Sequence, residues 1–468
     1  MISDLLGSFV GVVVAARVVK SHVTVDFCAN APDHVGDVGG IIDQEDVTPT
    51  ARSSGAPVTP SRRSWIVPVL AGGGLSAMTF PGQTAGLAVF TDPLLDQLGI
   101  DRTLLSLSYL IGTLVGATVQ PILGRLMDRW DVRRVIIAIA VVFALTLVGL
   151  SFVQDIVGLT VGYVGVRMFG QGALGLASST AVAQIVRRRR GLALGISGAI
   201  GSAGISLAPV LLERLVAAVG IGWAWRIEAL AVLIIAVPLA LVLPRPASIE
   251  PDPTRTDTGT LIVGGFTSGQ ARRTGMFWVL TAAISSTSML GTALAFHQIA
   301  LLGERGLTPL EAAANFLPQT VTALLATLAV GALIDRFNPR IFIVAPMVAM
   351  AASLLLVGVV QPGVLALVYG LVLGLAGGAL RGMEAASFVR YFGVTHIGSI
   401  RGLAISVSLV ASSLGPYALA LGEDLSGNLS VPAAWSASIP IVVAVLAVIV
   451  RTPTRGAVPG ATAHKSSS

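Results

Sequence analysis

The 468-residue chain is 54% hydrophobic and only 12% charged, about half of the ~25% charged residues that are typical of soluble domains. So few charges cannot cover the surface of a soluble globule of this length, and lipid must therefore be its main solvent. The formal net charge of +6 is not gathered in one basic patch, which excludes nucleic acid as a partner.

Residues 1–64 precede the first apolar stretch of membrane-spanning length. Residues 5–19 are apolar except for Arg17, and the following segment is rich in Asp, Pro, Ser and Thr. A signal peptide would have basic residues before the apolar run, where only Asp4 carries a charge. We predict a disordered or interfacial cytoplasmic tail, with a thirteenth hydrophobic element as the alternative. The single cysteine, Cys28, excludes an intramolecular disulfide.

Beyond the tail, uncharged stretches of membrane-spanning length recur as far as about residue 450. A hydrocarbon core of ~30 Å needs roughly 20 apolar residues per helix. Five stretches of this kind contain no Asp, Glu, Lys or Arg: 103–123, 135–153, 192–212, 312–333 and 403–422. Residues 341–380 are also uncharged and long enough for two spans, and Gln361-Pro362-Gly363 separates the two. We predict an all-α polytopic membrane protein with about twelve spans.

Arginines sort by the side of the membrane on which their loops lie. One set of loops holds Arg125, Arg129, Arg133, Arg134, Arg187 to Arg190, Arg245, Arg255, Arg272, Arg273, Arg336, Arg340, Arg390 and Arg401. The opposite set holds only Arg102, Arg214 and Arg305, together with most of the acidic residues. The positive-inside rule makes the first set cytoplasmic. We therefore expect a multi-pass protein of the plasma membrane with both termini in the cytoplasm.

Sequence landmarks repeat at nearly one offset. The stretch Gly124-Arg125-Leu126-Met127-Asp128-Arg129 recurs 207 residues later as Gly331-Ala332-Leu333-Ile334-Asp335-Arg336. Gly99 recurs as Gly306 at the same offset, and Arg190-Gly191-Leu192-Ala193 recurs 211 residues later as Arg401-Gly402-Leu403-Ala404. The chain therefore contains two copies of one plan.

The two copies define the expected domain organisation. We predict a six-helix bundle at 65–243, a polar cytoplasmic linker at 244–274, a second six-helix bundle at 275–450 and a cytoplasmic tail at 451–468. Parallel repeats about an axis along the membrane normal are a common plan of secondary transporters, whose site lies at the midplane between the halves.

The loop from Gly124 to Arg134 resembles the hallmark loop of the major facilitator superfamily, although Asp131 stands where that family usually has a second glycine. The resemblance implies a twelve-helix transporter that works by alternating access. It also implies a cytoplasmic gate latch, with ordinary loop capping as the alternative. The gating candidates are Gly124, Asp128, Arg129, Arg133, Asp335 and Arg336.

Other segments resemble the monocarboxylate and oxalate/formate branch of that family. They include Phe80-Pro81-Gly82-Gln83-Thr84, Arg102-Thr103, Tyr109, Gly112-Thr113 and the Arg189 to Gly195 segment. This branch commonly has a cationic residue in its eighth helix, whereas residues 312–333 contain none. The resemblance implies a small organic anion as substrate.

Ionised side chains within spans are costly and are functional candidates by default. Arg167 lies in the fourth span, and Arg381 and Glu384 lie in the tenth. Arg381 and Glu384 are three residues apart and can pair on one helix face, which leaves a structural ion pair as the alternative. For Arg167 we expect either anion binding or an architectural role, with Glu384 as one available partner.

Polar side chains add further candidates. His297 lies near the outer end of the seventh span and is a candidate for proton coupling beside Glu384, with a packing role as the alternative. Gln83 and Tyr109 in the first half, with Asn315 and Gln319 in the second, are candidates for substrate binding. Ser106, Tyr109 and Thr113 share one helix face, which we expect to avoid lipid.

Rival functions lack comparable support. Neither lysine follows a glycine, so the phosphate loop of an ATP-driven pump is absent from the sequence. An intramembrane serine protease with Ser197 and His297, a non-transporting sensor or scaffold, and an efflux pump for drug-like compounds remain alternatives. We predict a non-enzymatic secondary transporter of a small organic anion, with protons as a candidate coupling ion, no cofactor, no metal, and the lipid bilayer around a monomer.

Overall fold

Helices account for all regular structure in the part of the chain that the computed structural model describes, namely residues 65–186, 190–244, 266–334, 336–338, 340–393 and 397–452. Within these ranges, the side chains of residues 119–129, 190–191, 385–386, 389 and 397–399 are outside the description. Lipid offers the backbone no hydrogen-bond partner, so an uncharged span must bond internally as a helix. The predicted all-α membrane fold is confirmed.

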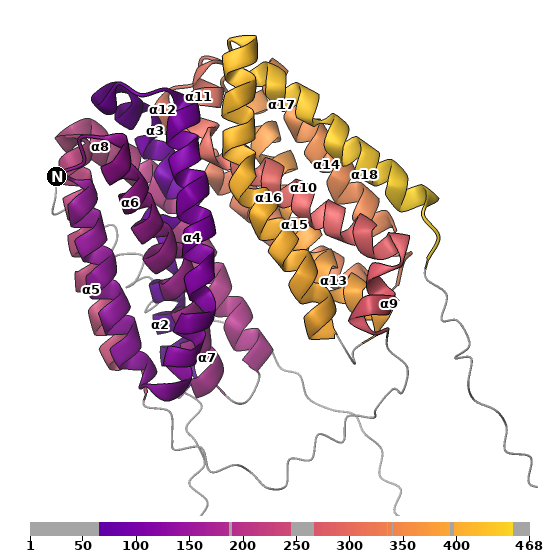
Figure 1. The fold of residues 1–468 in the computed structure, drawn as a ribbon, viewed down its shortest axis with the longest axis horizontal. Helices are drawn as coiled ribbons and strands as arrows, with labels where there is room; N and C mark the ends of the chain where they lie inside the picture. The colour runs from indigo at the N-terminus through magenta and orange to yellow at the C-terminus, as the bar shows by residue number, and fades with distance from the viewer. Residues whose placement is uncertain are drawn as a thin grey trace, which may run out of the picture. The chain divides into compact units, whose positions relative to one another are not determined.

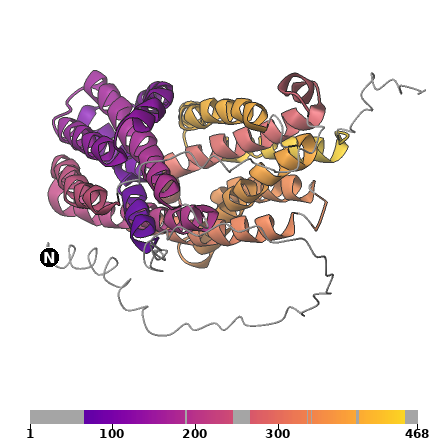
Figure 2. The same cartoon turned by 90° about the horizontal axis from the view of Figure 1, so that it is seen from below.

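The first copy of the repeat forms the N-terminal bundle (Figures 1 and 2). Its helices are α2 (Ile66–Ala77), η1 (Phe80–Gly82), α3 (Thr84–Leu98), α4 (Arg102–Arg129), α5 (Val132–Leu150), α6 (Ile156–Val166), η2 (Arg167–Leu174), α7 (Gly175–Ile185) and α8 (Arg190–Val242). Helix α8 contains two spans, because Gly220 adopts φ 77° and ψ 167° between them. Counting helices that follow end to end as one pass, the described residues make six passes here.

The second copy forms the C-terminal bundle. Its helices are α9 (Ser268–Arg272), α10 (Gly275–Phe296), α11 (Gln298–Gly303), α12 (Pro309–Ala314), α13 (Phe316–Leu333), α14 (Ile341–Leu356), η3 (Val357–Val359), α15 (Val364–Phe392), α16 (Ile397–Ser426), α17 (Ser430–Ser436) and α18 (Ser438–Ile449). After the short α9, these helices again make six passes. Eight described helices, one of them the double-length Leu192–Val242, meet the length and hydropathy of a single span. The other passes are broken into shorter helices or include undescribed side chains.

Predicted turns and repeats reappear in the backbone. Gly363 has φ 97° and separates η3 from α15, which confirms the predicted break at residues 361–363. Gly99 and Gly306 both adopt left-handed φ values, 62° and 85°. Only glycine takes this conformation at little cost, which explains why it is the one residue that the two copies share there.

The loop residue that departs from the family pattern caps a helix. Asp131 accepts a hydrogen bond from the backbone N–H of Arg133 at 3.0 Å and so caps α5. In the second copy, Asn338 accepts one from the backbone N–H of Arg340 at 3.1 Å. Asp131 thus satisfies a free donor in the first turn of α5, and Asn338 satisfies one in the turn just before α14, which a glycine cannot do.

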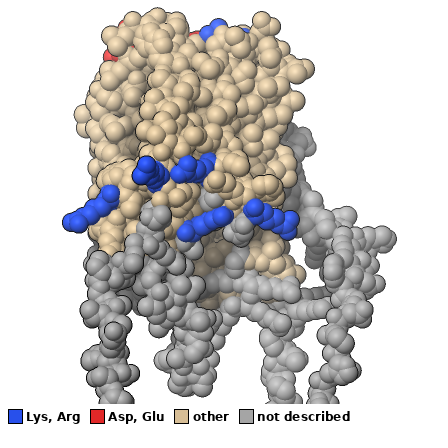
Figure 3. Space-filling model, turned by 90° about the vertical axis from the view of Figure 1, so that its right-hand side faces the viewer, with Lys and Arg blue, Asp and Glu red and all other residues tan. Residues whose placement is uncertain are grey.

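Charges divide the two ends of the helices (Figure 3). We call the end that carries Arg133, Arg340 and Arg390 the basic end, and the end that carries Asp92 and Glu423 the acidic end. Arg340 donates to the carbonyls of Val448 and Val450 at 2.9 and 2.7 Å, and Arg390 donates to the carbonyl of Ile334 at 2.7 Å. Arginines at the basic end therefore satisfy carbonyls at the C-terminal ends of neighbouring helices.

Exposed tryptophans mark the two membrane–water boundaries. Trp65, Trp130 and Trp278 are exposed at the basic end, and Trp223 and Trp435 are exposed at the acidic end. Indole rings favour the headgroup level on both sides of a bilayer. The helices between these two belts are therefore those that face the hydrocarbon.

Candidate functional site

The first pass breaks in its middle and exposes a carbonyl. Pro81 and Gly82 lie in the short η1, and Gln83 turns extended with ψ 152°, so that α3 starts afresh at Thr84. A Cβ on Gly82 would lie 2.2 Å from the carbonyl oxygen of Val166. Glycine is thus required for the close approach of the first and fourth passes. The broken helix leaves the Gly82 carbonyl available to a side chain from that fourth pass.

Arg167 reaches this carbonyl from the start of η2, a π-helical segment inside the fourth pass. Its Nη1 donates to the Gly82 carbonyl at 3.0 Å, and its Nε donates to Thr113 Oγ1 at 3.0 Å. The guanidinium also lies over the ring of Tyr109, 4.7 Å from the ring centroid. π-Helical turns inside α-helices occur frequently at functional sites. Three passes converge on one cation.

The Arg167 side chain is buried, with 4% exposed. Among the described residues no carboxylate pairs with it. A guanidinium offers five N–H donors, of which these contacts use two. The expected partner Glu384 is bonded elsewhere. Burial of a cation without a counter-charge is energetically unfavourable, and binding of an anion would relieve this cost.

The predicted polar face of α4 is confirmed as buried. Ser106, Tyr109 and Thr113 are at most 5% exposed. Tyr109 shares a hydrogen bond of 2.7 Å with Thr84 Oγ1, and Gln83 Nε2 donates to Thr79 Oγ1 at 2.9 Å. The candidates Gln83 and Tyr109 therefore lie around the break of the first pass.

A chain of amides occupies the corresponding region of the C-terminal bundle. Gln319 Nε2 donates to Gln298 Oε1 at 2.8 Å and to Asn315 Oδ1 at 3.1 Å. Asn315 donates to the carbonyl of Ala366 at 2.6 Å, and Gln298 donates to the carbonyl of Ala312 at 2.8 Å. The structure thus brings the candidates Asn315 and Gln319 together and adds Gln298, which the sequence analysis missed. The sequence feature that could have identified Gln298 is its polar side chain within an otherwise apolar pass.

His297 is buried, with 1% exposed. Its Nε2 donates to the carbonyl of Pro416 on α16 at 2.9 Å, and its Nδ1 has no partner among the described residues. Ser197, the alternative protease nucleophile, lies in the N-terminal bundle beside Gly72, whereas His297 lies in the C-terminal bundle. No hydrogen bond in the described part of the chain joins these two side chains. The histidine links the seventh and eleventh passes.

Arg381 and Glu384 do not form the ion pair that their spacing allowed. Glu384 Oε1 instead accepts from Arg401 Nη2 of α16 at 3.0 Å. Arg381 is exposed on α15 and has no bonded partner among the described residues. Gly377, one turn earlier, places no side chain beside its guanidinium. Arg167 in one bundle and Arg381 in the other are therefore arginines within passes that have no carboxylate partner among the described residues, and no described contact joins the two.

The two bundles are in direct contact. The ring centroids of Tyr109 and Phe296 are 4.5 Å apart, which brings the partner of Arg167 against the seventh pass. Ser206 of α8 and Thr320 of α13 also share a hydrogen bond. Ala88 of α3 packs into an apolar cluster whose other buried members belong to the C-terminal bundle.

Ionic contacts close the acidic end. Arg102, at the start of α4, forms salt bridges with Asp92 of its own bundle at 2.9 Å and with Glu423 of α16 at 3.1 Å. Thr103 Oγ1 donates to Asp424 Oδ2 at 2.7 Å. Figure 1 shows α4 and α16 approaching each other at this end and diverging towards the other. The sequence analysis placed its gate only at the basic end and missed these contacts.

Most of the predicted gate at the basic end lies outside the described residues. This holds for Asp335 and for the side chains of Asp128 and Arg129, whereas Gly124 is described only as part of α4. Arg336 is exposed. Arg133 is half-buried, and its Nε has no hydrogen-bond partner among the described residues.

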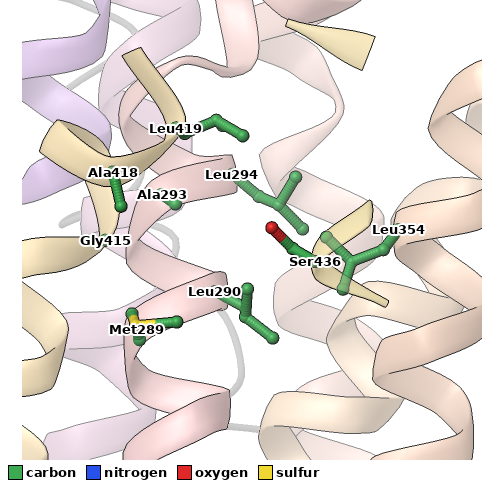
Figure 4. A pocket seen from close by; sticks show the side chains of 9 residues that line it. All are labelled: Met289, Leu290, Ala293, Leu294, Leu354, Gly415, Ala418, Leu419 and Ser436. Atoms are coloured by element: carbon green, nitrogen blue, oxygen red, sulfur yellow. The ribbon is translucent and has the colours of Figure 1, made fainter. Parts of the chain in front are cut away.

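A small cavity lies inside the C-terminal bundle and has a volume of about 40 Å³ (Figure 4). Met289, Leu294, Leu354 and other apolar side chains line it, with the Ser436 hydroxyl as the polar exception. This hydroxyl donates to the carbonyl of Pro432. A volume close to that of one water molecule excludes this cavity as the site of an organic solute.

The sequence of residues 73–416 matches the family profile of the Major Facilitator Superfamily. This match covers most of the chain, and the protein belongs to that family. It is a multi-pass membrane protein and a secondary transporter of a small-molecule substrate, not an enzyme. A search of curated protein sequences found no match.

Solved structures share this fold. A bacterial homologue of the human lysosomal transporter Spinster, inward-facing and unoccupied, aligns with a TM-score of 0.63 at 17% identity over 83% of this chain and 96% of that one. Its inward-facing occupied form gives 0.61 at 17% identity, over 81% and 94%. A mutant of the nucleoside transporter NupG gives 0.66 at 13% identity, over 81% and 99%. Such identities establish the fold alone.

Proposed function

We propose that the protein carries a small organic anion of the monocarboxylate class, as in the oxalate/formate branch, by alternating access. The observation that carries this proposal is the buried Arg167. It is buried, is oriented by Thr113 and the Gly82 carbonyl, has no carboxylate partner among the described residues, and has more N–H donors than these contacts use. A guanidinium prefers carboxylate among organic groups, because its planar fork matches two oxygens.

Arg381 supplies the second cation in this proposal. An exposed charge on a pass of the C-terminal bundle is costly against lipid, which favours an orientation towards the path between the bundles. The amide chain of Gln298, Asn315 and Gln319 then offers neutral donors, and Tyr109 with Phe296 bounds the path where the two bundles touch. Gln83 lies at the break of the first pass, where it completes the site.

The conformation is one that is closed at the acidic end, with Arg102 bridging to Glu423 as its latch. Basic loops indicate that the opposite end is cytoplasmic in the plasma membrane, with both termini there. Asp128, Arg129, Arg133, Asp335 and Arg336, next to Gly124, would then latch the cytoplasmic side in the alternate state. We expect a monomer, as for a path enclosed by one chain.

Exchange in proteoliposomes tests the proposal. Vesicles preloaded with formate or oxalate should take up the labelled anion, whereas vesicles preloaded with a sugar or a cationic drug should not take up their labelled counterparts. Arg167→Ala should abolish anion exchange. Arg226→Ala is the matched control, because Arg226 stacks on Phe152 and Trp223 at the acidic end, away from the path. Anion exchange that persists in both Arg167→Ala and Arg381→Ala would overturn the anion assignment.

A further inference from the structure

Glu228 is a buried carboxyl group that no described side chain or backbone group satisfies. It lies in the second span of α8 and is 2% exposed. Neither Oε1 nor Oε2 has a hydrogen-bond partner among the described residues. Native proteins rarely leave a buried polar atom unpaired, so each case calls for a physical reason. The sequence analysis did not single out this residue.

The surroundings of Glu228 are apolar. One turn earlier, Trp225 is buried, stacks on Phe90 of α3 at 3.7 Å between ring centroids, and leaves its Nε1 without a partner. Ala229 and Val232 on the same helix are also buried. Without a counter-charge, such surroundings disfavour an ionised carboxylate far more than a neutral carboxyl group.

Charged groups on the elements packed against α8 do not reach Glu228. On α8 itself, α3, α5 and α12 these groups are Glu213, Arg214, Arg226, Asp92, Asp96, Arg133, Arg134 and Glu311. Asp92 forms a salt bridge with Arg102, and Arg226 donates a hydrogen bond to the hydroxyl of Ser151, the residue that follows α5. No salt bridge or hydrogen bond among the described residues joins any of them to the Glu228 carboxyl.

The fold itself does not demand this carboxyl. The last pass of the C-terminal bundle, α17 with α18, is the counterpart of the span that holds Glu228 and contains no Asp or Glu. Of the two earlier candidates for proton coupling, Glu384 pairs with Arg401, and His297 bonds the Pro416 carbonyl through Nε2 while its Nδ1 has no partner among the described residues. Glu228 is the carboxyl in the described spans that is buried and without a partner.

We propose that Glu228 is the proton-binding site that couples transport to the pH gradient. This proposal rests on the proposed anion transport. In the conformation closed at the acidic end, the carboxyl is protonated and sealed. The carboxyl takes up this proton while the acidic end is open and releases it towards the basic end once the anion has left, so that one bound proton crosses with each anion. Protonation also removes the unpaired charge from the interior.

Infrared spectroscopy of the protein in lipid tests the proton site directly. The wild type should show the C=O stretch of a protonated carboxyl at neutral pH, and Glu228→Gln should lose it. Glu384→Gln is the matched control, because its ion-paired carboxylate contributes no such band. A Glu228→Gln spectrum with the band intact would overturn the proposal. Thermal unfolding should be similar in Glu228→Gln and the wild type, since an amide replaces a neutral acid of the same shape.

Transport assays distinguish proton coupling from anion exchange. Accumulation is taken as uptake above that of protein-free vesicles, which formic acid enters by diffusion through the lipid. With an acid-outside gradient, wild-type vesicles should then accumulate labelled formate faster than at equal pH, towards about tenfold for each unit of pH difference, as one proton per anion requires. Glu228→Gln should exchange formate as fast as the wild type but accumulate none. Gradient-driven accumulation that survives in Glu228→Gln, or that is absent from the wild type, overturns the coupling role. If the wild type fails even to exchange formate or oxalate, the proposed anion function fails, and the infrared band still decides the proton site.

Discussion

The two bundles hold their unpaired arginines in different ways. In the N-terminal bundle, Arg167 is fixed by a hydroxyl, a backbone carbonyl and an aromatic face, and is 4% exposed. In the C-terminal bundle, Arg381 is exposed without a fixed partner, while Glu384 is taken by Arg401. The repeat therefore conserves a backbone plan and not a site. A preorganised cation and a free cation should respond differently to the same substitution.

The largest effect is expected from lysine substitutions at these two positions. Arg167→Lys keeps the charge but cannot donate to Thr113 and the Gly82 carbonyl in one plane, so anion exchange should fall by about a hundredfold, as for loss of a buried charged contact. Arg381→Lys should retain most exchange, because a single free charge suffices there. Initial rates of labelled formate exchange in proteoliposomes measure both. The reverse ranking would show that the C-terminal bundle anchors the anion.

Sequence alone predicted the parts that follow from hydropathy and local turn chemistry. The spans, the break at residues 361–363 and the buried face of Ser106, Tyr109 and Thr113 were predictable because lipid forces helices and excludes polar stripes. The hydrogen-bond partner of Arg167 could not be predicted, because the Gly82 carbonyl lies 85 residues away in the sequence and is freed only by the break of its own helix.

The ion pairs could not be predicted from the sequence either. Spacing made Arg381 an available partner for Glu384, but the packing of α15 against α16 brings Arg401 within 3.0 Å of it instead. Helical spacing states which residues share a face and cannot state which other helix faces them. The salt bridge at the acidic end was not predicted for the same reason, because Arg102 and Glu423 belong to different bundles.

The second largest effect concerns two close helix approaches, one in each bundle. A Cβ on Gly82 would lie 2.2 Å from the carbonyl of Val166, and a Cβ on Gly374 would lie 2.1 Å from that of Gln319. Gly82→Ala and Gly374→Ala should each lower the free energy of unfolding by about 1–3 kcal/mol, because backbone must move. Gly175→Ala is the control, since nothing lies within 4 Å of its Cβ position. Thermal unfolding in detergent measures all three.

Transport should then separate the two glycine variants. Gly82→Ala displaces the acceptor of Arg167 and should reduce anion exchange beyond its loss of stability, whereas folded Gly374→Ala protein should still exchange formate. Equal exchange by the two variants, normalised to folded protein, would contradict the anchoring role of the N-terminal bundle.

A smaller effect is expected at the latch that joins the bundles. Arg102→Ala removes salt bridges to Asp92 and Glu423, each worth about 1 kcal/mol or less at a partly exposed site, so the open population should rise by several-fold. Maleimide labelling reports this opening through Ala88→Cys at the contact between bundles, in a Cys28→Ser background that leaves no other thiol. Arg305→Ala is the control, because Arg305 bonds Ser430 within its own bundle. A labelling rate equal to that of the control would rule out the latch.

The smallest effect should be nearly the same in both bundles, because it concerns a feature that the repeat preserves. Asp131 caps α5 by accepting a hydrogen bond from the backbone N–H of Arg133, and Asn338 accepts one from the backbone N–H of Arg340, the residue just before α14. Asp131→Ala and Asn338→Ala should each lower the free energy of unfolding by about 0.5–2 kcal/mol, whereas Asp131→Gly, which restores the usual family residue, should cost only a few tenths. Thermal unfolding of the three variants ranks them. If Asp131→Gly were as destabilising as Asp131→Ala, the side-chain cap would be contributing more than helix capping, and the two loops would differ in function despite their shared geometry.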